Sequence, residues 1–200
     1  RPVDLHIAGM ESLGAEIVIE DGFIKASRRE RLRGATINLP FPSVGATENI
    51  IMAASLAEGT TRINNSALEP EIIDLVDCLN AWGANIRGAG KSTIVIEGVQ
   101  KMNGGFFRVM SDRIETATFL AAAAATGGKI RTRNVDPTNI SAVLEKLRKA
   151  GGDLTLGADW IELDMRGKRP KAVDFKTGPY PDFPTDMQAQ FTVVNSLAIG

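Results

Sequence analysis

Three segments of the chain place small and polar residues where a helix is predicted to begin. They are Ser43–Thr47 (SVGAT), Ser111–Glu115 (SDRIE) and Pro184–Gln188 (PTDMQ). The first N–H groups of a helix have no partner inside the helix, and together with the helix dipole they favour a bound anion. The first segment is a turn of small residues, which would let a phosphate approach the backbone. These three helix starts are therefore candidate anion sites.

Helix capping accounts for the same three segments without a ligand. Thr185 with Gln188 fits the capping box, in which two side chains satisfy the first free N–H groups of a helix. Asp112 with Glu115 is a looser version of that motif. From spacing alone, capping is the simpler explanation at each position, and anion binding remains the alternative.

The other side chains that could do chemistry have ordinary structural explanations. His6 is the only histidine, so this chain alone cannot supply a two-histidine metal site, and neither a metal nor a cofactor is predicted. Cys78 lies on a predicted core-facing helix and is expected to be a buried, unreactive thiol. Two basic runs are expected to be solvated turns rather than phosphate sites: Arg28, Arg29, Arg31 and Arg33, and residues 166–171.

An internal repeat positions these segments. A glycine followed by a small residue recurs at Gly14, Gly83 and Gly151, at almost equal intervals along the chain. Gly59 recurs as Gly127 with the same period. Such periodicity indicates one supersecondary unit used several times. Because the chain begins and ends within a repeat, we expect it to be a piece of a longer polypeptide.

Each repeat is predicted to run helix, strand, helix, strand, strand, strand. Apolar residues at helical spacing stop at the repeated glycines, and short β-branched runs around Gly-containing turns predict hairpins. Helices that alternate with strands and hairpins indicate α/β units with a mixed sheet. The predicted helices are 47–57, 70–82, 114–125 and 140–150, and the predicted strands are 61–64, one from 86, 93–96, 106–110, 129–133, 154–156, 161–163 and 173–176.

The composition is that of a globular protein and argues against several other classes of protein. Of the 200 residues, 44% are hydrophobic and 24% are charged, which is unlike a disordered chain. The net charge of −1 argues against a nucleic-acid-binding domain, and the single cysteine excludes an internal disulfide framework. No apolar run reaches transmembrane length, so we expect no membrane partner and a cytoplasmic location.

Four strings of residues resemble the UDP-N-acetylglucosamine 1-carboxyvinyltransferase family, and the resemblance extends over all 200 residues. Three of them are Arg1–His6 (RPVDLH), Ser43–Thr47 (SVGAT) and Asp112–Thr116 (DRIET), and the most specific is Phe183–Phe191 (FPTDMQAQF). Members of this family move the enolpyruvyl group of phosphoenolpyruvate to the 3′-hydroxyl of UDP-N-acetylglucosamine and release phosphate, which opens peptidoglycan synthesis. The resemblance therefore implies these two small molecules as substrates.

The resemblance also implies the fold and the domain organisation. The family fold is an inverse α/β barrel of two similar domains, each made of three such units around a cleft. A boundary is implied near Met110, so that residues 1–110 belong to the first, catalytic-loop-bearing domain and 111–200 to the second. The remainder of the same polypeptide would then be this chain's partner, and the chain alone is expected to be inactive.

Matching motifs assign roles to residues of this chain. The segment Arg1–His6 would line the uridine end of the nucleotide site, with Arg1 also near the phosphoenolpyruvate phosphate. Ser43–Gly45 would hold the diphosphate, and Asp186 would be the acid–base residue at the sugar hydroxyl. The assigned residues are Arg1, Pro2, Val3, Asp4, Leu5, His6, Ser43, Val44, Gly45, Thr185 and Asp186.

Two features depart from the family pattern. The family often carries a lysine two residues before Ser43, where this chain has Phe41, so the diphosphate would need a different anchor. The family's reactive cysteine lies on a loop just before the Arg1 segment, outside this sequence, and Cys78 does not match its motif.

Other interpretations of the same fold remain open. Enolpyruvylshikimate phosphate synthase and RNA 3′-phosphate cyclase are similar in architecture but match neither Arg1–His6 nor Thr185–Gln190. A non-catalytic relative that binds a nucleotide sugar without turnover is a different class, and it stays possible because the cysteine loop is not in this sequence. Fold alone does not decide between them, because function depends on the site.

Overall fold

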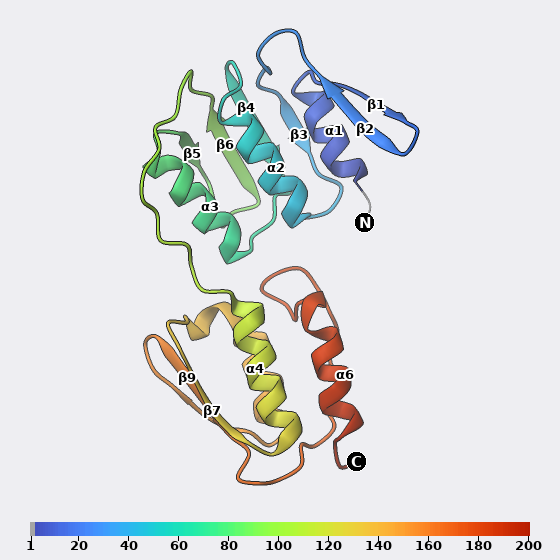
Figure 1. Cartoon of the computed structure of the whole chain (residues 1–200), viewed down its shortest axis with the longest axis vertical. Helices are drawn as coiled ribbons and strands as arrows, with labels where there is room; N and C mark the ends of the chain where they lie inside the picture. Colours follow the sequence, from blue (N-terminus) through green and yellow to red (C-terminus); the bar gives the residue numbers. More distant parts are fainter. Residues whose placement is uncertain (1–2) are drawn as a thin grey trace. The chain divides into compact units, whose positions relative to one another are not determined.

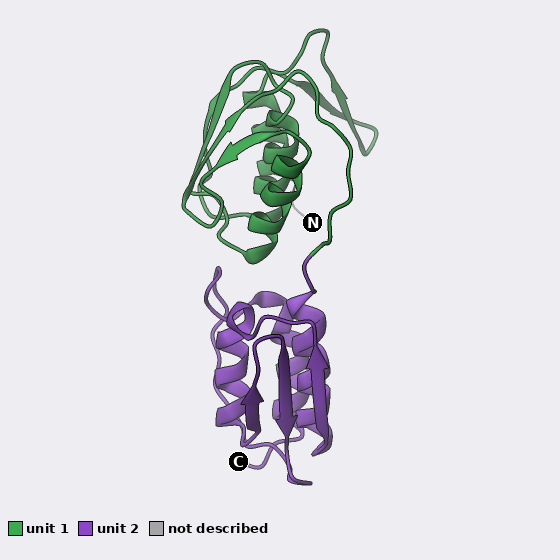
Figure 2. Ribbon diagram, turned by 90° about the vertical axis from the view of Figure 1, so that its left-hand side faces the viewer, with its two compact units in different colours: residues 1–109 green, residues 110–200 purple. Residues whose placement is uncertain are grey.

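The computed structural model describes residues 3–200, whose helices and strands follow the repeat (Figure 1). Two compact units, residues 1–109 and 110–200, are coloured separately in Figure 2. The first holds α1 (Asp4–Ser12), β1 (Glu16–Glu20), β2 (Phe23–Ser27), β3 (Thr36–Asn38), α2 (Val44–Ala54), β4 (Thr60–Asn64), α3 (Pro70–Ala81), β5 (Asn85–Arg87) and β6 (Thr93–Glu97). The second holds α4 (Arg113–Thr126), β7 (Lys129–Arg133), the 3-10 turn η1 (Pro137–Ile140), α5 (Ser141–Lys149), β8 (Asp153–Leu156), β9 (Trp160–Asp164), the 3-10 turn η2 (Thr185–Met187) and α6 (Gln188–Ser196).

The repeated glycines end three helices in the same way. Gly14, Gly83 and Gly151 each lie two residues beyond α1, α3 or α5, with φ angles of 90°, 97° and 99°. This left-handed conformation is readily adopted only without a Cβ atom. The N–H of the residue after each glycine then donates to a helix carbonyl at 3.0 Å, which satisfies a carbonyl that the helix leaves free. The predicted repeat is therefore a repeated helix–turn–hairpin unit.

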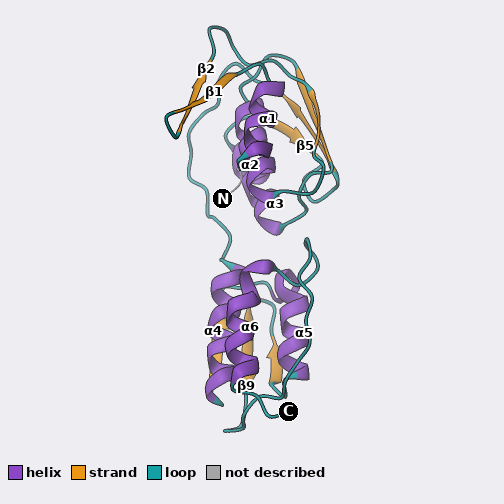
Figure 3. Cartoon of the chain, turned by 90° about the vertical axis from the view of Figure 1, so that its right-hand side faces the viewer, coloured by secondary structure: helices purple, strands orange, loops and turns teal. Residues whose placement is uncertain are grey.

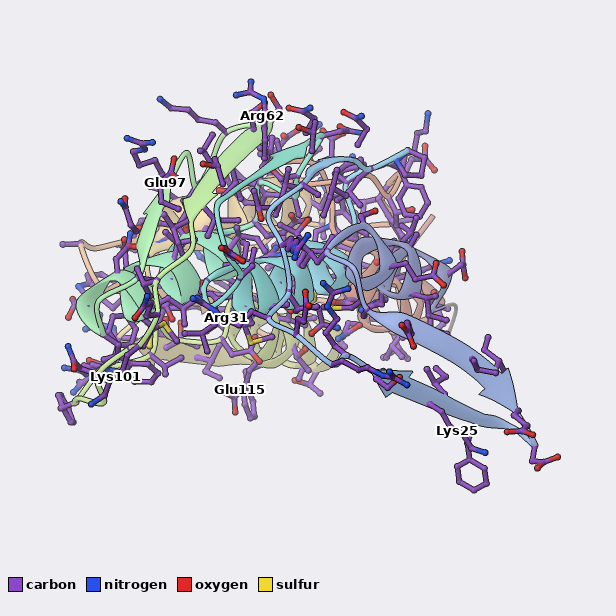
Figure 4. The ribbon with its side chains drawn as sticks, turned by 90° about the horizontal axis from the view of Figure 1, so that it is seen from above. Lys25, Arg31, Arg62, Glu97, Lys101 and Glu115 are labelled. Carbon is purple, nitrogen blue, oxygen red and sulfur yellow. The ribbon has the colours of Figure 1, made fainter. Side chains whose placement is uncertain are left out.

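Both units contain the same three-stranded arrangement. β6 pairs antiparallel with β4 and β5, and β9 pairs antiparallel with β7 and β8. In the first unit β3 adds parallel to β4, which gives the order β3-β4-β6-β5. Arg62 and Glu97 lie on the face of that sheet opposite its helices (Figure 4), and α4, α5 and α6 cover one face of the second sheet (Figure 3). The predicted α/β class is confirmed.

Each unit has its own hydrophobic core. In the first unit, strand residues that alternate with exposed ones meet apolar residues of α2 and α3. Fully burying one such isoleucine is worth about 1.5–3 kcal/mol. The α1 helix approaches closely, because a Cβ atom on Gly9 would lie 2.6 Å from Ile50. The largest fully buried side chains of this core are Leu13, Ile50, Ile51, Ile63, Ile72, Ile94 and Ile96.

Two predicted strands, 106–110 and 173–176, are wrong. Phe106 is 94% exposed, and its segment joins no β-ladder of the described chain. At Val173, a side-chain amide takes the place of a neighbouring strand, because Asn195 donates to the Val173 carbonyl at 2.9 Å and accepts from its N–H at 3.1 Å. The apolar pattern is present in both segments, but no adjacent strand of the described chain pairs with either.

The loop after the β1–β2 hairpin is anchored by a side chain predicted to be solvated. Arg31 donates to the carbonyls of Leu56 and Val99 at 2.8 Å, near the end of α2. The hairpin itself projects from the first unit, with Lys25 on its second strand, β2 (Figure 4). Arg31 is exposed, as predicted, and its guanidinium in addition binds backbone carbonyls. Among the described helices none is long and apolar enough to cross a membrane.

Candidate functional site

The start of α2 has the geometry of an anion site. Ser43 has extended φ and ψ of −105° and 118°, and its hydroxyl accepts the Ala46 N–H at a long 3.4 Å. The helix begins at Val44, earlier than the predicted start at Thr47, and Ser43 is its N-cap residue. Val44 and Gly45 therefore lie in that turn, where N–H groups lack helical acceptors. The weak cap bond leaves the turn suited to a second acceptor.

The imidazole of His6 packs on this turn. A Cβ atom on Gly45 would lie 3.1 Å from Cε1 of His6, so the absence of a side chain permits the contact. One turn further along α2, the Asn49 amide nitrogen lies 2.6 Å from Nδ1 of His6. With Asn49 as the donor, Nδ1 accepts. The structure thus brings the N-terminal segment and the predicted diphosphate segment together.

The other residues of the N-terminal segment differ in exposure. Val3 is the N-cap residue of α1 and is 39% exposed, while Asp4 is an exposed acid in the first turn. Leu5 is half-buried against the core of the first unit. Arg1 and Pro2 lie outside the described residues. Within the described part of the segment, Asp4 is therefore the acidic side chain most available to a ligand.

A carboxylate cluster lies beside these residues. Burial raises the pKa of Glu48, and the negative charges of Glu71 and Glu69 raise it further, while His6 opposes them. Glu69 is buried, and its Oε2 has no hydrogen-bond partner in the described chain. No sequence signal identified this cluster, because Glu48 lies on α2, and Glu69 and Glu71 flank Pro70 as ordinary residues at the start of α3.

The predicted capping box at Thr185 and Gln188 is wrong. Residues 185–187 form the 3-10 turn η2, so Gln188 is the first residue of α6 and not the third. Neither η2 nor α6 begins with a side-chain cap bond. Asp186 is exposed, whereas the next residue, Met187, is fully buried. The turn is thus anchored by its apolar residue, and capping does not explain the carboxylate of Asp186.

Capping does explain the start of α4. Asp112 accepts the N–H groups of Ile114 at 2.8 Å and Glu115 at 3.0 Å through one carboxylate oxygen. This carboxylate already occupies the position that a bound anion would take. Of the two helix starts that a side chain caps, α2 and α4, the start of α2 is therefore the one whose first turn is less filled.

Cys78 matches its prediction only in part. It lies on α3 as a free thiol and is half-buried rather than buried. The contacts described above at the start of α2 are made by His6, Ser43 and Asn49, and none of them involves this thiol. It contributes nothing to this site.

Comparison with known proteins shows the family of the chain. The whole chain, residues 1–200, matches the family described as EPSP synthase (3-phosphoshikimate 1-carboxyvinyltransferase). UDP-N-acetylglucosamine 1-carboxyvinyltransferase from Klebsiella pneumoniae is 60% identical, and the protein of that name from Shewanella amazonensis is 58% identical. Each alignment covers 100% of this chain and 48% of the relative, so the chain spans about half the length of the curated relatives it matches.

Solved structures show the same fold. The enolpyruvyl transferase NikO from Streptomyces tendae superposes with a TM-score of 0.84 at 22% identity, over 100% of this chain and 50% of that one. An EPSP synthase from Acinetobacter baumannii gives 0.63 at 24% identity, over 88% of this chain and 42% of that one. At these identities the likeness concerns the fold alone.

Proposed function

This chain belongs to the EPSP synthase family, and we propose that the protein containing it transfers an enolpyruvyl group from phosphoenolpyruvate to UDP-N-acetylglucosamine. The contact of His6 with Gly45 at the open first turn of α2 carries the proposal. It unites two motifs that the resemblance assigns to one nucleotide-sugar site. The 60% identity to proteins named for that substrate favours it over 3-phosphoshikimate.

The open turn suits a diphosphate chemically. The N–H groups of Val44 and Gly45 would donate to its oxygens, and the helix dipole adds a favourable field worth about 0.3–1 kcal/mol. The Ser43 hydroxyl, held by only a long cap bond, would turn to donate as well. Val3–His6 would extend the site toward uridine, and Arg1 and Pro2 complete that segment in the sequence.

In the proposed reaction, the second unit would supply the acid–base residue. The sugar 3′-hydroxyl adds to C2 of phosphoenolpyruvate while C3 gains a proton, and the resulting tetrahedral intermediate then loses phosphate and a C3 proton. Asp186 would take the hydroxyl proton during the addition. Thr185, its neighbour in η2, would contact the same substrate. Residues 1–110 would belong to the catalytic-loop-bearing domain and residues 111–200 to the other, each completed by the remainder of the polypeptide. A cytoplasmic location stays a prediction.

The full-length protein tests this function. Incubated with phosphoenolpyruvate and UDP-N-acetylglucosamine, it is expected to release one phosphate for each nucleotide sugar that gains the mass of an enolpyruvyl group. Phosphate release with 3-phosphoshikimate in place of the nucleotide sugar would support the shikimate alternative. Nucleotide-sugar binding by calorimetry without any turnover would instead support the non-catalytic relative.

Replacing Asp4 with alanine in the full-length protein is expected to weaken nucleotide-sugar binding about five- to a hundredfold. The reason is the loss of one hydrogen bond to the uridine end, worth roughly 1–3 kcal/mol. Because Asp4 is exposed, stability should change by less than about 1 kcal/mol. Calorimetry measures the affinity, and Glu11→Ala, at an exposed acid of the same helix, is the control. Equal affinities of the two variants would reject the assignment.

Replacing Phe41 with lysine is expected to tighten nucleotide-sugar binding by up to about fivefold at low salt. Phe41 is 58% exposed and lies two residues before Ser43, so an ammonium there would face the bound diphosphate across solvent. Salt screening should remove most of the gain. Phe23→Lys, on the exposed hairpin at 69% exposure, is the control and should change nothing. A gain that persists in high salt would contradict this explanation.

A further inference from the structure

A buried arginine lies at the start of α4. Arg113 is the first residue of this helix, and only 8% of it is exposed. The helix dipole disfavours a positive charge in the first turn, and burial removes much of the water around that charge. The side-chain cap of α4 comes from Asp112 instead. Arg113 therefore has little to offer its own helix, and its role is to be sought in what its guanidinium contacts.

The ring of Tyr180 is one such contact. The guanidinium carbon of Arg113 lies 5.5 Å from the centre of this ring, within the range of a cation–π interaction. Such interactions are stronger when the cation is removed from water, as it is here. A cavity of about 80 Å³ lies beside the stack, lined by Arg113, Tyr180 and Pro184 among others. Because packing is incomplete there, the stack matters for where the Tyr180 loop lies.

Tyr180 belongs to a closed loop that leads directly into η2. The ends of residues 177–183 meet in a parallel bridge between Thr177 and Phe183. The N–H of Gly178 donates to the Phe183 carbonyl at 3.0 Å and closes the loop a second time. In a compact loop whose ends are joined, a contact at one residue restrains the others. A contact at Tyr180 thus restrains the point from which η2 starts.

The placement of η2 matters because it carries Asp186. This residue is exposed, and neither η2 nor α6 begins with a side-chain cap bond, so its carboxylate depends on how the turn is anchored. A general base acts only within hydrogen-bond reach of the proton that it takes. A displacement of about 1 Å can cost about a hundredfold in rate.

We infer that the stack of Arg113 on Tyr180 positions η2 and, through it, the carboxylate of Asp186. Arg113 and Tyr180 are then positioning residues that act through Asp186 and need no contact with substrate. A planar guanidinium stacks on an aromatic face, which a lysine ammonium cannot do. This inference deepens the proposed function and rests on it, because the stack affects catalysis only if Asp186 is the base.

Kinetics of the full-length protein test the inference. Tyr180→Leu, which removes the ring, should lower kcat about tenfold and change KM for the nucleotide sugar less than about twofold. Tyr180→Phe keeps the ring and should stay within about twofold of the wild-type kcat. In an Asp186→Ala background, Tyr180→Leu should cost nothing further, because both act through one group. A double variant with the full product of the two losses, or a wild-type kcat for Tyr180→Leu, would overturn the inference.

A second stack in the same unit provides the matched control. The guanidinium of Arg131 on β7 lies 4.2 Å from the ring of Trp160 on β9, outside the loop before η2. Trp160→Leu removes the same kind of contact and should leave kcat unchanged. An equal fall in kcat for Trp160→Leu and Tyr180→Leu would show a general loss of stability and would also overturn the inference.

Arg113→Lys tests the other side of the stack and remains informative if Tyr180→Leu does not fold. It keeps the positive charge and loses the planar group, so it should lower kcat about threefold. In the Asp186→Ala background it should have no effect on kcat. A loss of the same size in both backgrounds would contradict a role through Asp186.

Hydrogen exchange gives a measurement that needs no substrate. The N–H of Met187 donates to the Pro184 carbonyl at 3.1 Å within η2, so its exchange rate reports how firmly the turn is held. Exchange should be about tenfold faster in Tyr180→Leu and unchanged in Trp160→Leu. An unchanged rate in Tyr180→Leu would refute the positioning of η2. If the wild-type protein shows no turnover, the proposed function fails, and this rate still decides whether the stack holds η2.

Discussion

Replacing Asp186 with alanine in the full-length protein is expected to lower kcat by at least about a hundredfold. A positioned general base typically contributes about 10²–10⁴ in rate, roughly 3–5 kcal/mol of barrier. The structure separates this role from a structural one, because Asp186 is exposed and η2 has no side-chain cap bond. Stability should therefore change by less than about 0.5 kcal/mol. A cap residue would have cost about 1 kcal/mol instead.

Single-turnover kinetics and calorimetry check this expectation together. Nucleotide-sugar affinity of Asp186→Ala should stay near that of the wild type, since the proposed diphosphate contacts lie on Ser43, Val44 and Gly45. Asp182→Asn is the matched control, because Asp182 is an exposed carboxylate shortly before η2 in the chain. If Asp186→Ala turns over at the wild-type rate, the proton is taken by another group. If it loses nucleotide-sugar affinity while kcat stays near that of the wild type, Asp186 binds the substrate and is not the base.

The repeat and the hairpins were predictable because the interactions that form them are local. Each glycine after a helix takes a left-handed conformation, and the hairpin that follows needs only its own two strands. The two segments wrongly predicted as strands show what a local sequence pattern cannot predict. Residues 106–110 and 173–176 have strand-like sequences, but a strand exists only where another one pairs with it. Which backbone groups Asn195 satisfies depends on the tertiary structure.

The motifs of the candidate site could be predicted from the sequence, but the residues that pack around them could not. Small residues at Ser43–Gly45 indicated an anion site from their chemistry, and the open turn agrees with that choice. The contact of His6 with Gly45 joins residues far apart in the sequence, so no spacing rule reveals it. The same holds for the burial of Glu69 and for its charge near Glu48, because the two residues come from different helices. Arg31 is a third case, since its carbonyl partners are also distant along the chain.

Which of the three helix starts a side chain caps could also not be predicted from the sequence. All three helix starts have similar polar residues, yet Asp112 fills its own first turn, and Ser43 satisfies its helix only weakly. At Thr185 the helix start is a 3-10 turn, so the predicted capping box with Gln188 does not form.

Replacing Phe191 with alanine is expected to destabilise the protein by about 3–5 kcal/mol, the usual cost of deleting a fully buried aromatic side chain. Phe191 has no exposed surface, and its ring lies 4.9 Å from that of Phe183 and 5.7 Å from that of Phe175. Such aromatic pairs add about 0.5–1.5 kcal/mol each beyond the area they bury. The urea midpoint of the full-length protein should fall accordingly.

The same substitution should also disturb catalysis through position. Phe183 lies directly before Pro184, and Phe191 lies in α6 directly after η2, so this aromatic pair holds the turn that carries Asp186 from both sides. Loosening that pair should lower kcat, because Asp186 would lose its fixed position. Phe119→Ala is the matched control, because Phe119 is 53% exposed on α4 and its loss should cost less than about 1 kcal/mol. Equal urea midpoints for the two phenylalanine variants would show that the aromatic cluster does not anchor η2, and the position of Asp186 would then need another cause.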